Sequence, residues 1–328
     1  MDESSSSQSI MEDRISDLPD SLIHMILSFI DIKYAVQTSV LSKRWQYIWR
    51  SLTMLNLDVS QLSGRSRTGA FTKFISFVYK VFLFRDDHRI QRFQLNFRQD
   101  SIDSSHIDTW IDKAVKHNVE ELCIKNETMD EFSIFSHSLC TCKSLTKLEL
   151  ELSFGFIFGS EIASTPVILP KLKSMNLQFR YLSPDNVKLA NVLFTKCPAL
   201  ESLVLDIRIC RTTNLRISVP TLKHFSLSLT SGSYLGPNKV TLCAPNLSSF
   251  ICFSNLLDDY CLESLSSLVT ADVRINIGQD DKVNKTEIRE AKKVSYAQSI
   301  MKLMIRLHKE KVLSLTNDFK VWQPLLLI

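Results

Sequence analysis

The side chains that could bind a metal ion lie closest together at His137, Cys140 and Cys142. A structural zinc site usually takes four Cys or His ligands. Here a Cys-x-Cys pair has one nearby His and no second pair, and the other six cysteines are scattered. Most lie in apolar, strand-like runs, where Cys packs as a small hydrophobic residue. We therefore predict a loop of small packed side chains at residues 137–142, reduced thiols, and no metal or other cofactor.

Motifs for catalysis or phosphate binding are missing from this sequence. It contains no GxSxG, GxxxxGK[ST], HExxH or GxGxxG. The segment 155–159 begins and ends with Gly, but it is apolar and has no Lys nearby. Paired acids such as 120–121 and 258–259 have the sequence surroundings of ordinary exposed positions. We therefore expect a protein without catalytic residues.

Composition and charge exclude several other classes. The 328 residues carry 39 Lys and Arg against 35 Asp and Glu, mixed along the chain, whereas nucleic-acid binding favours a concentrated basic face. No apolar run approaches the ~18 residues that cross a bilayer. Residues 1–10 are rich in Ser and lack a signal-peptide pattern, which predicts a disordered tail. These features predict a cytoplasmic or nuclear protein that binds neither nucleic acid nor membrane.

Three short helices are predicted near the N-terminus. The sequence Asp-Leu-Pro-Asp at 17–20 is typical of a helix start, and an apolar stretch follows to residue 30. Two further helical stretches are predicted at about 31–40 and from about 42 onwards. Three helices in about 45 residues cannot bury so much apolar surface by themselves. Either the rest of the chain or another protein must cover them, and periodicity does not decide between the two.

The remainder of the chain repeats the pattern apolar-x-x-apolar-x-apolar, which is typical of a strand with alternate side chains buried. Clear copies span residues 90–95, 119–124, 145–150, 172–177, 200–205, 222–227 and 247–252, with a weaker copy at 268–273 and a last one at 313–315. The clear copies are about 22–29 residues apart, the period of leucine-rich repeats. Pro introduces several of them, where it fixes the turn into the strand without interrupting a ladder.

Helical patterns lie between some of these strands, at about 71–82, 107–115 and 186–196. Strand plus helix or loop, repeated, builds a curved solenoid with parallel strands on its concave side. The middle apolar residues of six copies should form one continuous buried column. They are Leu122, Leu148, Met175, Leu203, Phe225 and Phe250.

The N-terminal segment 13–30, with 35–49 after it, closely resembles an F-box. The motif Val-Leu-Ser-Lys-Arg-Trp at 40–45 resembles sequences of the large plant F-box/leucine-rich-repeat family. A weaker shared feature is Cys-Pro-Ala-Leu-Glu at 197–201. The resemblance implies an α/β fold with an F-box at 11–57 and a right-handed solenoid at 58–328. Such proteins often carry a further C-terminal module, which we expect to be absent or truncated here.

The resemblance implies a substrate receptor of an SCF-type cullin-RING ubiquitin ligase. Its F-box would dock on a Skp-type adaptor, called ASK in plants, and through it on a cullin, while the repeats hold an unknown protein substrate. By analogy, the adaptor-facing residues would be Leu18, Pro19, Leu22, Ile23, Ile26, Leu27, Val40, Leu41 and Trp45. The alternatives are a leucine-rich-repeat scaffold outside the ligase and, more weakly supported, a small-molecule receptor.

Substrate contacts are expected on the concave face, because strand alternation points every second side chain there. The candidates are Lys147, Glu149, Asn176, Asp206, His224, Ile251 and Phe253. The polar ones could equally belong to an ordinary solvated sheet face. Ile251 and Phe253 are harder to explain that way, because adjacent exposed apolar side chains often mark a binding site.

Overall fold

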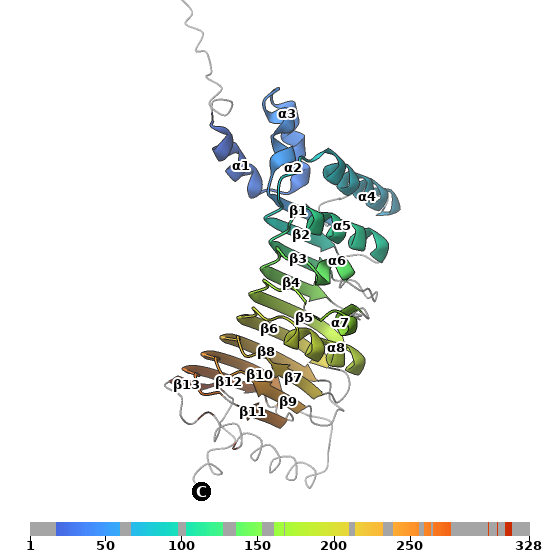
Figure 1. Cartoon of the computed structure of the whole chain (residues 1–328). Helices are drawn as coiled ribbons and strands as arrows, with labels where there is room; N and C mark the ends of the chain where they lie inside the picture. The colour runs from blue at the N-terminus through green and yellow to red at the C-terminus, as the bar shows by residue number, and fades with distance from the viewer. Residues whose placement is uncertain are drawn as a thin grey trace, which may run out of the picture.

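Three short helical segments cover one end of a long, curved stack of parallel strands (Figure 1). The computed structural model describes residues 18–59, 67–97, 103–126, 136–152, 161–166, 168–209, 214–231, 239–255, 259–263, 265–276, 301, 307 and 312–316. The mixed α/β architecture predicted from the sequence is confirmed. Among the described helices, none is both long and apolar enough to span a bilayer.

The N-terminal part consists of α1 (Asp20–Ser28), α2 (Ile32–Gln37) with the 3-10 turn η1 (Thr38–Val40), and α3 (Trp45–Ile48) with η2 (Trp49–Ser51). Pro19 precedes α1 and Asp20 lies in its first turn, where a carboxylate interacts favourably with the helix dipole. The Asp31 carboxylate begins α2 by accepting a hydrogen bond from the Lys33 amide at 2.7 Å. The predicted three helices are therefore confirmed.

Within the described residues, the main sheet contains ten strands, all parallel, in the order β1-β2-β3-β4-β5-β6-β8-β10-β12-β13. Their bounds are β1 (Met54–Asp58), β2 (Arg92–Phe97), β3 (Glu121–Asn126), β4 (Lys147–Leu152), β5 (Ser174–Leu182), β6 (Ser202–Ile209), β8 (His224–Ser231), β10 (Ser249–Asn255), β12 (Thr270–Asn276) and β13 (Val312–Thr316). Every repeat copy read from the sequence is a strand here, including the last one.

The predicted buried column is confirmed residue by residue. Leu122, Leu148, Met175, Leu203, Phe225 and Phe250 are paired in register across β3, β4, β5, β6, β8 and β10, and all are buried. The rings of the last two lie stacked, with centroids 5.8 Å apart. Successive repeats therefore bury each other's apolar side chains, as expected of a solenoid.

Helices cover one side of the N-terminal half of the sheet (Figure 1). They are α4 (Arg67–Phe84), α5 (Ser104–Lys116), α6 (His137–Cys140), α7 (Glu161–Ser164) and α8 (Pro184–Thr195). The predicted helical stretches at 71–82, 107–115 and 186–196 coincide with α4, α5 and α8. The loop predicted at 137–142 is wrong in part, because a short helix forms there, with the Ser136 hydroxyl accepting from the Leu139 amide.

A second parallel sheet replaces the helices in the C-terminal half. It consists of β7 (Asn214–Ser218), β9 (Lys239–Cys243) and β11 (Asp259–Glu263), in the order β11-β9-β7. The Asn191 side chain of α8 covers the free edge of β7, because its Nδ2 donates to the Asn214 carbonyl at 3.0 Å and its Oδ1 accepts from the Arg216 amide at 2.8 Å. This sheet was not predicted from the sequence.

The N-terminal helices are joined rigidly to the solenoid. Strand β1 crosses the predicted domain boundary at residues 57 and 58 and pairs with β2. Buried Asp31 accepts a hydrogen bond from the Asp58 amide at 2.9 Å. Buried Arg85 donates to the carbonyls of Leu52 and His88, and burial lowers its pKa to about 10. Backbone and buried side-chain hydrogen bonds thus hold the two parts in one orientation.

Candidate functional site

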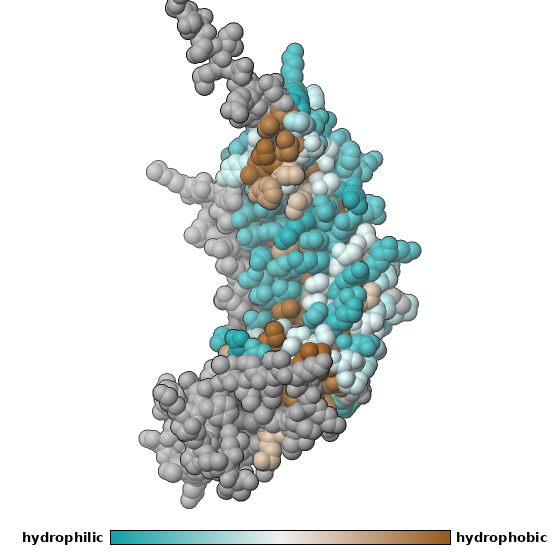
Figure 2. Space-filling view, turned by 90° about the vertical axis from the view of Figure 1, so that its left-hand side faces the viewer, coloured by the Kyte–Doolittle hydropathy of each residue, from teal (hydrophilic) through white to brown (hydrophobic). Residues whose placement is uncertain are grey.

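An apolar surface lies on the N-terminal helices. Exposed side chains on α1 and around η1 form it, and we call it the F-box surface: Leu22, Met25, Ile26, Phe29, Val40 and Leu41. Val40 is 87% exposed and Phe29 is 81% exposed, which is unusual for large apolar residues in a folded domain. In Figure 2, where the side opposite the helices of the solenoid faces the viewer, apolar residues gather at this end of the molecule.

Three of the nine predicted adaptor-facing residues point inward instead. Ile23, Leu27 and Trp45 are buried in the core of the chain itself. Their side chains are therefore unavailable to a partner and support the surface from beneath. Leu18 is half-buried against the same core, whereas Pro19 is exposed. The reason for the difference is that α1 is apolar on two sides, and one of them packs inward.

Polar contacts fix the orientation of α1 relative to the following helices. Arg44, just before α3, forms an ion pair with Asp20 in the first turn of α1, at 2.5 Å between Nη2 and Oδ1. The His24 ring is hydrogen-bonded to the Ser51 hydroxyl at 2.8 Å. Both contacts lie beside the exposed apolar side chains and hold the backbone that carries them.

Met25 and Phe29 belong to this surface but were not predicted. Together with Leu22 and Ile26 they follow the spacing i, i+3, i+4 and i+7 along α1 and its C-cap Phe29, which is one continuous helix face. This spacing of apolar residues can be read from the sequence.

The second surface is the face of the ten-stranded sheet opposite the helices, which we call the open face; it corresponds to the predicted concave side. All seven predicted substrate residues lie on it, at the non-core positions of β4, β5, β6, β8 and β10. Lys147 and Glu149 form an ion pair at 4.0 Å. The other five are distributed over β5, β6, β8 and β10.

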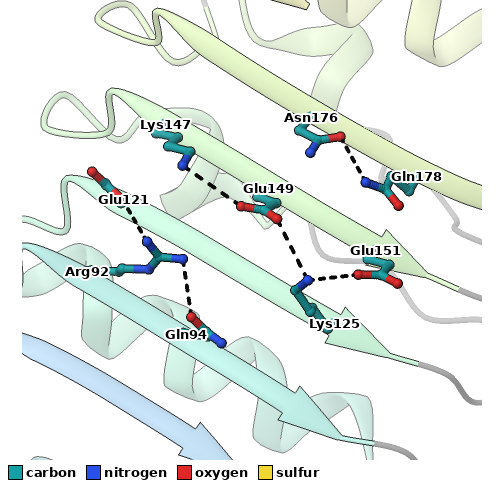
Figure 3. A network of polar contacts seen from close by, with 9 residues as sticks. All are labelled: Arg92, Gln94, Glu121, Lys125, Lys147, Glu149, Glu151, Asn176 and Gln178. Carbon is teal, nitrogen blue, oxygen red and sulfur yellow. Dashed lines mark hydrogen bonds and ion pairs between the residues drawn. The ribbon is translucent and has the colours of Figure 1, made fainter. Parts of the chain in front are cut away.

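Charged side chains on β2, β3 and β4 are paired with one another (Figure 3). Arg92 contacts Glu121 at 3.6 Å, and Lys125 contacts Glu151 at 2.9 Å and Glu149 at 3.9 Å. The hydrogen bond to Glu151 raises the pKa of Lys125. This part of the open face is a network of complementary charges.

Cys123 lies within this network and is buried despite being on the open face. Burial, with the nearby Glu149 carboxylate adding to it, raises the pKa of the Cys123 thiol to about 11. A thiol of this kind is neutral at physiological pH and a poor nucleophile. No cluster of three or more His, Cys, Asp or Glu side chains arranged to hold a metal exists among the described residues.

Farther along the stack the open face becomes less charged. Asn176 accepts a hydrogen bond from Gln178 at 3.5 Å, and Ser226 and Ser228 follow on β8. Ile251 and Phe253 on β10 are exposed by 42% and 38%, respectively. On β12, Asp272 pairs with Arg274 at 2.8 Å. Figure 2 shows the hydrophilic middle of this face and apolar residues again toward the C-terminal strands.

A helical module with an exposed apolar face, fused to a parallel strand-and-helix solenoid, defines the class as an F-box joined to leucine-rich repeats. A family model described as "F-box domain" matches residues 15–56. A second, "FBD-associated F-box protein At5g56370, LRR repeats", matches residues 107–321. The chain belongs to the F-box/leucine-rich-repeat family of plants.

Curated relatives from Arabidopsis thaliana support this assignment. The chain is 33% identical to F-box/LRR-repeat protein At4g14103 over 267 residues, covering 81% of this chain and 68% of the relative. It is 33% identical to putative FBD-associated F-box protein At5g56690 over 58% of this chain and 46% of that protein. It is 31% identical to F-box/LRR-repeat protein At4g14096 over 81% of this chain and 55% of that protein. The chain thus spans about half to two thirds of these relatives.

Proposed function

We propose that this protein is the substrate-recognition subunit of an SCF-type cullin-RING ubiquitin ligase. The observation that carries the proposal is the F-box surface, because large apolar side chains remain exposed on a module that is otherwise packed and rigidly attached. Contiguous exposed apolar surface on a folded domain marks a protein interface. The F-box family match supports a Skp-type adaptor as the partner, and the adaptor would link the chain to a cullin.

Covering the exposed apolar side chains would contribute favourable free energy to such an interface. Full burial of a Leu or Ile side chain contributes roughly 1.5–3 kcal/mol. Leu22 and Ile26 are 42% and 48% exposed, so covering the remainder contributes about 1 kcal/mol each. Met25, Phe29, Val40 and Leu41 are more exposed and add to this. The rigid junction at Asp31 and Arg85 would then transmit the adaptor's position to the solenoid.

Substrate binding is proposed for the open face, centred on Ile251 and Phe253. Interface energy concentrates in a few apolar or aromatic anchors, and these two are the large apolar side chains exposed on the described strands of this face. Lys147, Glu149, Asn176, Asp206 and His224 would orient the substrate. In this role the protein performs no chemistry itself, since the acyl transfer belongs to other subunits.

The adaptor interface is tested by titrating the purified full chain with a Skp-type adaptor. Leu18→Ala with Pro19→Ala removes apolar contact and the preset start of α1, and we expect at least tenfold weaker binding. Leu83→Ala is the matched control, because Leu83 is a 73% exposed apolar residue on α4 and lies outside the F-box surface. Equal affinities for all three proteins would overturn the assignment of Leu18 and Pro19 to the interface, and failure of the wild-type chain to bind the adaptor would favour a scaffold outside the ligase.

The substrate surface is tested by the double variant Ile251→Ser with Phe253→Ser. Both side chains are exposed, so the melting temperature and adaptor affinity should stay unchanged while substrates recovered with the stalled ligase disappear. Recovery of the same substrates by this variant, quantified by mass spectrometry, would show that other residues bind them.

A further inference from the structure

Three neighbouring strands of the open face, β6, β8 and β10, differ in the size and polarity of their side chains. Strand β8 contributes Ser226 and Ser228, which lie in register between Val204 and Asp206 of β6 on one side and Ile251 and Phe253 of β10 on the other. Strands in a sheet are about 4.8 Å apart, so the outer two rows are about 10 Å apart. The serine side chains are smaller than those of Ile251 and Phe253 beside them, so apolar side chains border the serine row on one side.

The charge on this part of the face differs from that on β2–β4. The open-face carboxylates Glu121, Glu149 and Glu151, and Asp272 on β12, are each paired with Lys or Arg. Asp206 is exposed and forms no ion pair with any residue that the structure describes. Arg208, two residues along the same strand, is also exposed. Asp206 therefore offers an exposed carboxylate beside the serine row, without an ion pair to any described residue.

We propose that Asp206, Ser226, Ser228, Ile251 and Phe253 together bind a protein segment in which a large apolar side chain lies close to a Lys or Arg. This rests on the proposed substrate-receptor function and specifies the class of substrate segment. The apolar side chain packs on Ile251 and Phe253, and the cation pairs with Asp206 across the serine row. The serine hydroxyls hydrogen-bond the segment's backbone.

The spacing of the two contacts fixes the sequence pattern. Residues on one side of an extended segment recur every second position, about 6.6 Å apart. A Lys or Arg side chain reaches several ångströms farther, so a cation two or four residues from the apolar anchor spans the ~10 Å between β10 and β6. An acidic residue at the position of this Lys or Arg would be disfavoured, because its carboxylate would face the Asp206 carboxylate.

The probe is a random 12-residue peptide display library, selected on the immobilised full chain and counter-selected on the Ile251→Ser, Phe253→Ser variant. We expect enriched peptides to carry Phe, Leu, Ile, Met or Trp with Lys or Arg two or four residues away, at least threefold above the starting library. Failure to enrich any peptide that depends on Ile251 and Phe253 would overturn the proposal.

The role of Asp206 is tested on the enriched peptides by fluorescence anisotropy. Asp206→Asn should weaken their binding at least threefold at low ionic strength, and the loss should shrink in high salt. The matched control is Arg208→Gln, which removes a positive charge of the same sign as the peptide's Lys or Arg. This variant should bind the peptides equally well or more tightly. Equal weakening by the two variants would contradict a cation at Asp206.

The outcomes separate this inference from the proposed function. The enriched peptides could be apolar without a preference for Lys or Arg, and Asp206→Asn could leave their binding unchanged. This result would leave Ile251 and Phe253 as substrate anchors and refute the proposed substrate class. Basic–apolar peptides bound by a chain that does not bind the adaptor would uphold the surface and refute the ligase assignment.

Discussion

Leu203 occupies the centre of the buried column, and its replacement probes the repeat architecture. The side chain is fully buried in β6, in register with Met175 on β5 and Phe225 on β8. Leu→Ala at such a site costs about 2–5 kcal/mol from lost burial and the remaining cavity. With an expected total stability of about 5–15 kcal/mol, we predict that Leu203→Ala lowers the free energy of unfolding by about 3 kcal/mol. Leu203→Asp should abolish cooperative folding, because it buries a carboxylate without a partner.

The assay is urea unfolding monitored by circular dichroism, with Val204→Ala as the control. Val204 is adjacent in the chain but half-buried on the open face, so the loss of two methyl groups there should cost about 1 kcal/mol or less. Equal destabilisation by Leu203→Ala and Val204→Ala, or a Leu203→Asp variant that unfolds like the wild type, would refute the register.

Asn191→Ala removes both hydrogen bonds to the edge of β7 and should cost about 1–2 kcal/mol, since each bond contributes about 1 kcal/mol. Faster hydrogen exchange at the Arg216 amide would be its local signature, and unchanged exchange there would contradict the edge role. Burial, with the nearby Asp112 and Asp103 carboxylates adding to it, raises the pKa of Asp108 from 3.8 to about 6. The charged Asp108 carboxylate therefore lowers the free energy of unfolding above pH 6, and this destabilisation decreases as the pH falls towards 3.8. Asp108→Asn should therefore raise the free energy of unfolding by about 1 kcal/mol at pH 7, allowing for solvent screening, and by less at pH 4.5. An equal increase at both pH values would show that titration of the Asp108 carboxyl is not the cause.

The repeats were predictable because their signal is both local and periodic. Each copy places apolar residues at fixed offsets, and parallel stacking in register then follows from burying all of them together. Met175, Phe225 and Phe250 depart from Leu at the middle position but keep the burial. Irregular repeats therefore remained recognisable, because the sheet requires an apolar side chain there and accepts several shapes.

The second sheet was missed although its strands alternate. Residues 214–218, 239–243 and 259–263 each show apolar side chains at every second position, with Leu215, Ile217, Val240, Leu242 and Leu262 buried. Each segment is only five residues long, and the helices between earlier repeats led us to expect helix or loop. The missing information is tertiary: three short strands become stable by pairing with one another.

The F-box surface was predictable only in part. Apolar residues on two sides of α1 indicated that both sides need cover, but the sequence could not tell which side packs against Trp45 and which faces outward. The structure places Ile23 and Leu27 inside and Leu22 and Ile26 outside. That choice depends on how α1 meets the later helices, through contacts such as Arg44 with Asp20.

The most direct test of the central claim is the mass of the complex formed by the purified full chain, a Skp-type adaptor and a cullin, measured by size-exclusion chromatography with light scattering. We predict a single species containing one copy of each protein, which forms only when the adaptor is present and is lost in the Leu22→Glu, Ile26→Glu variant. Elution of the wild-type chain by itself, apart from an intact adaptor–cullin complex at micromolar concentration, would contradict the account.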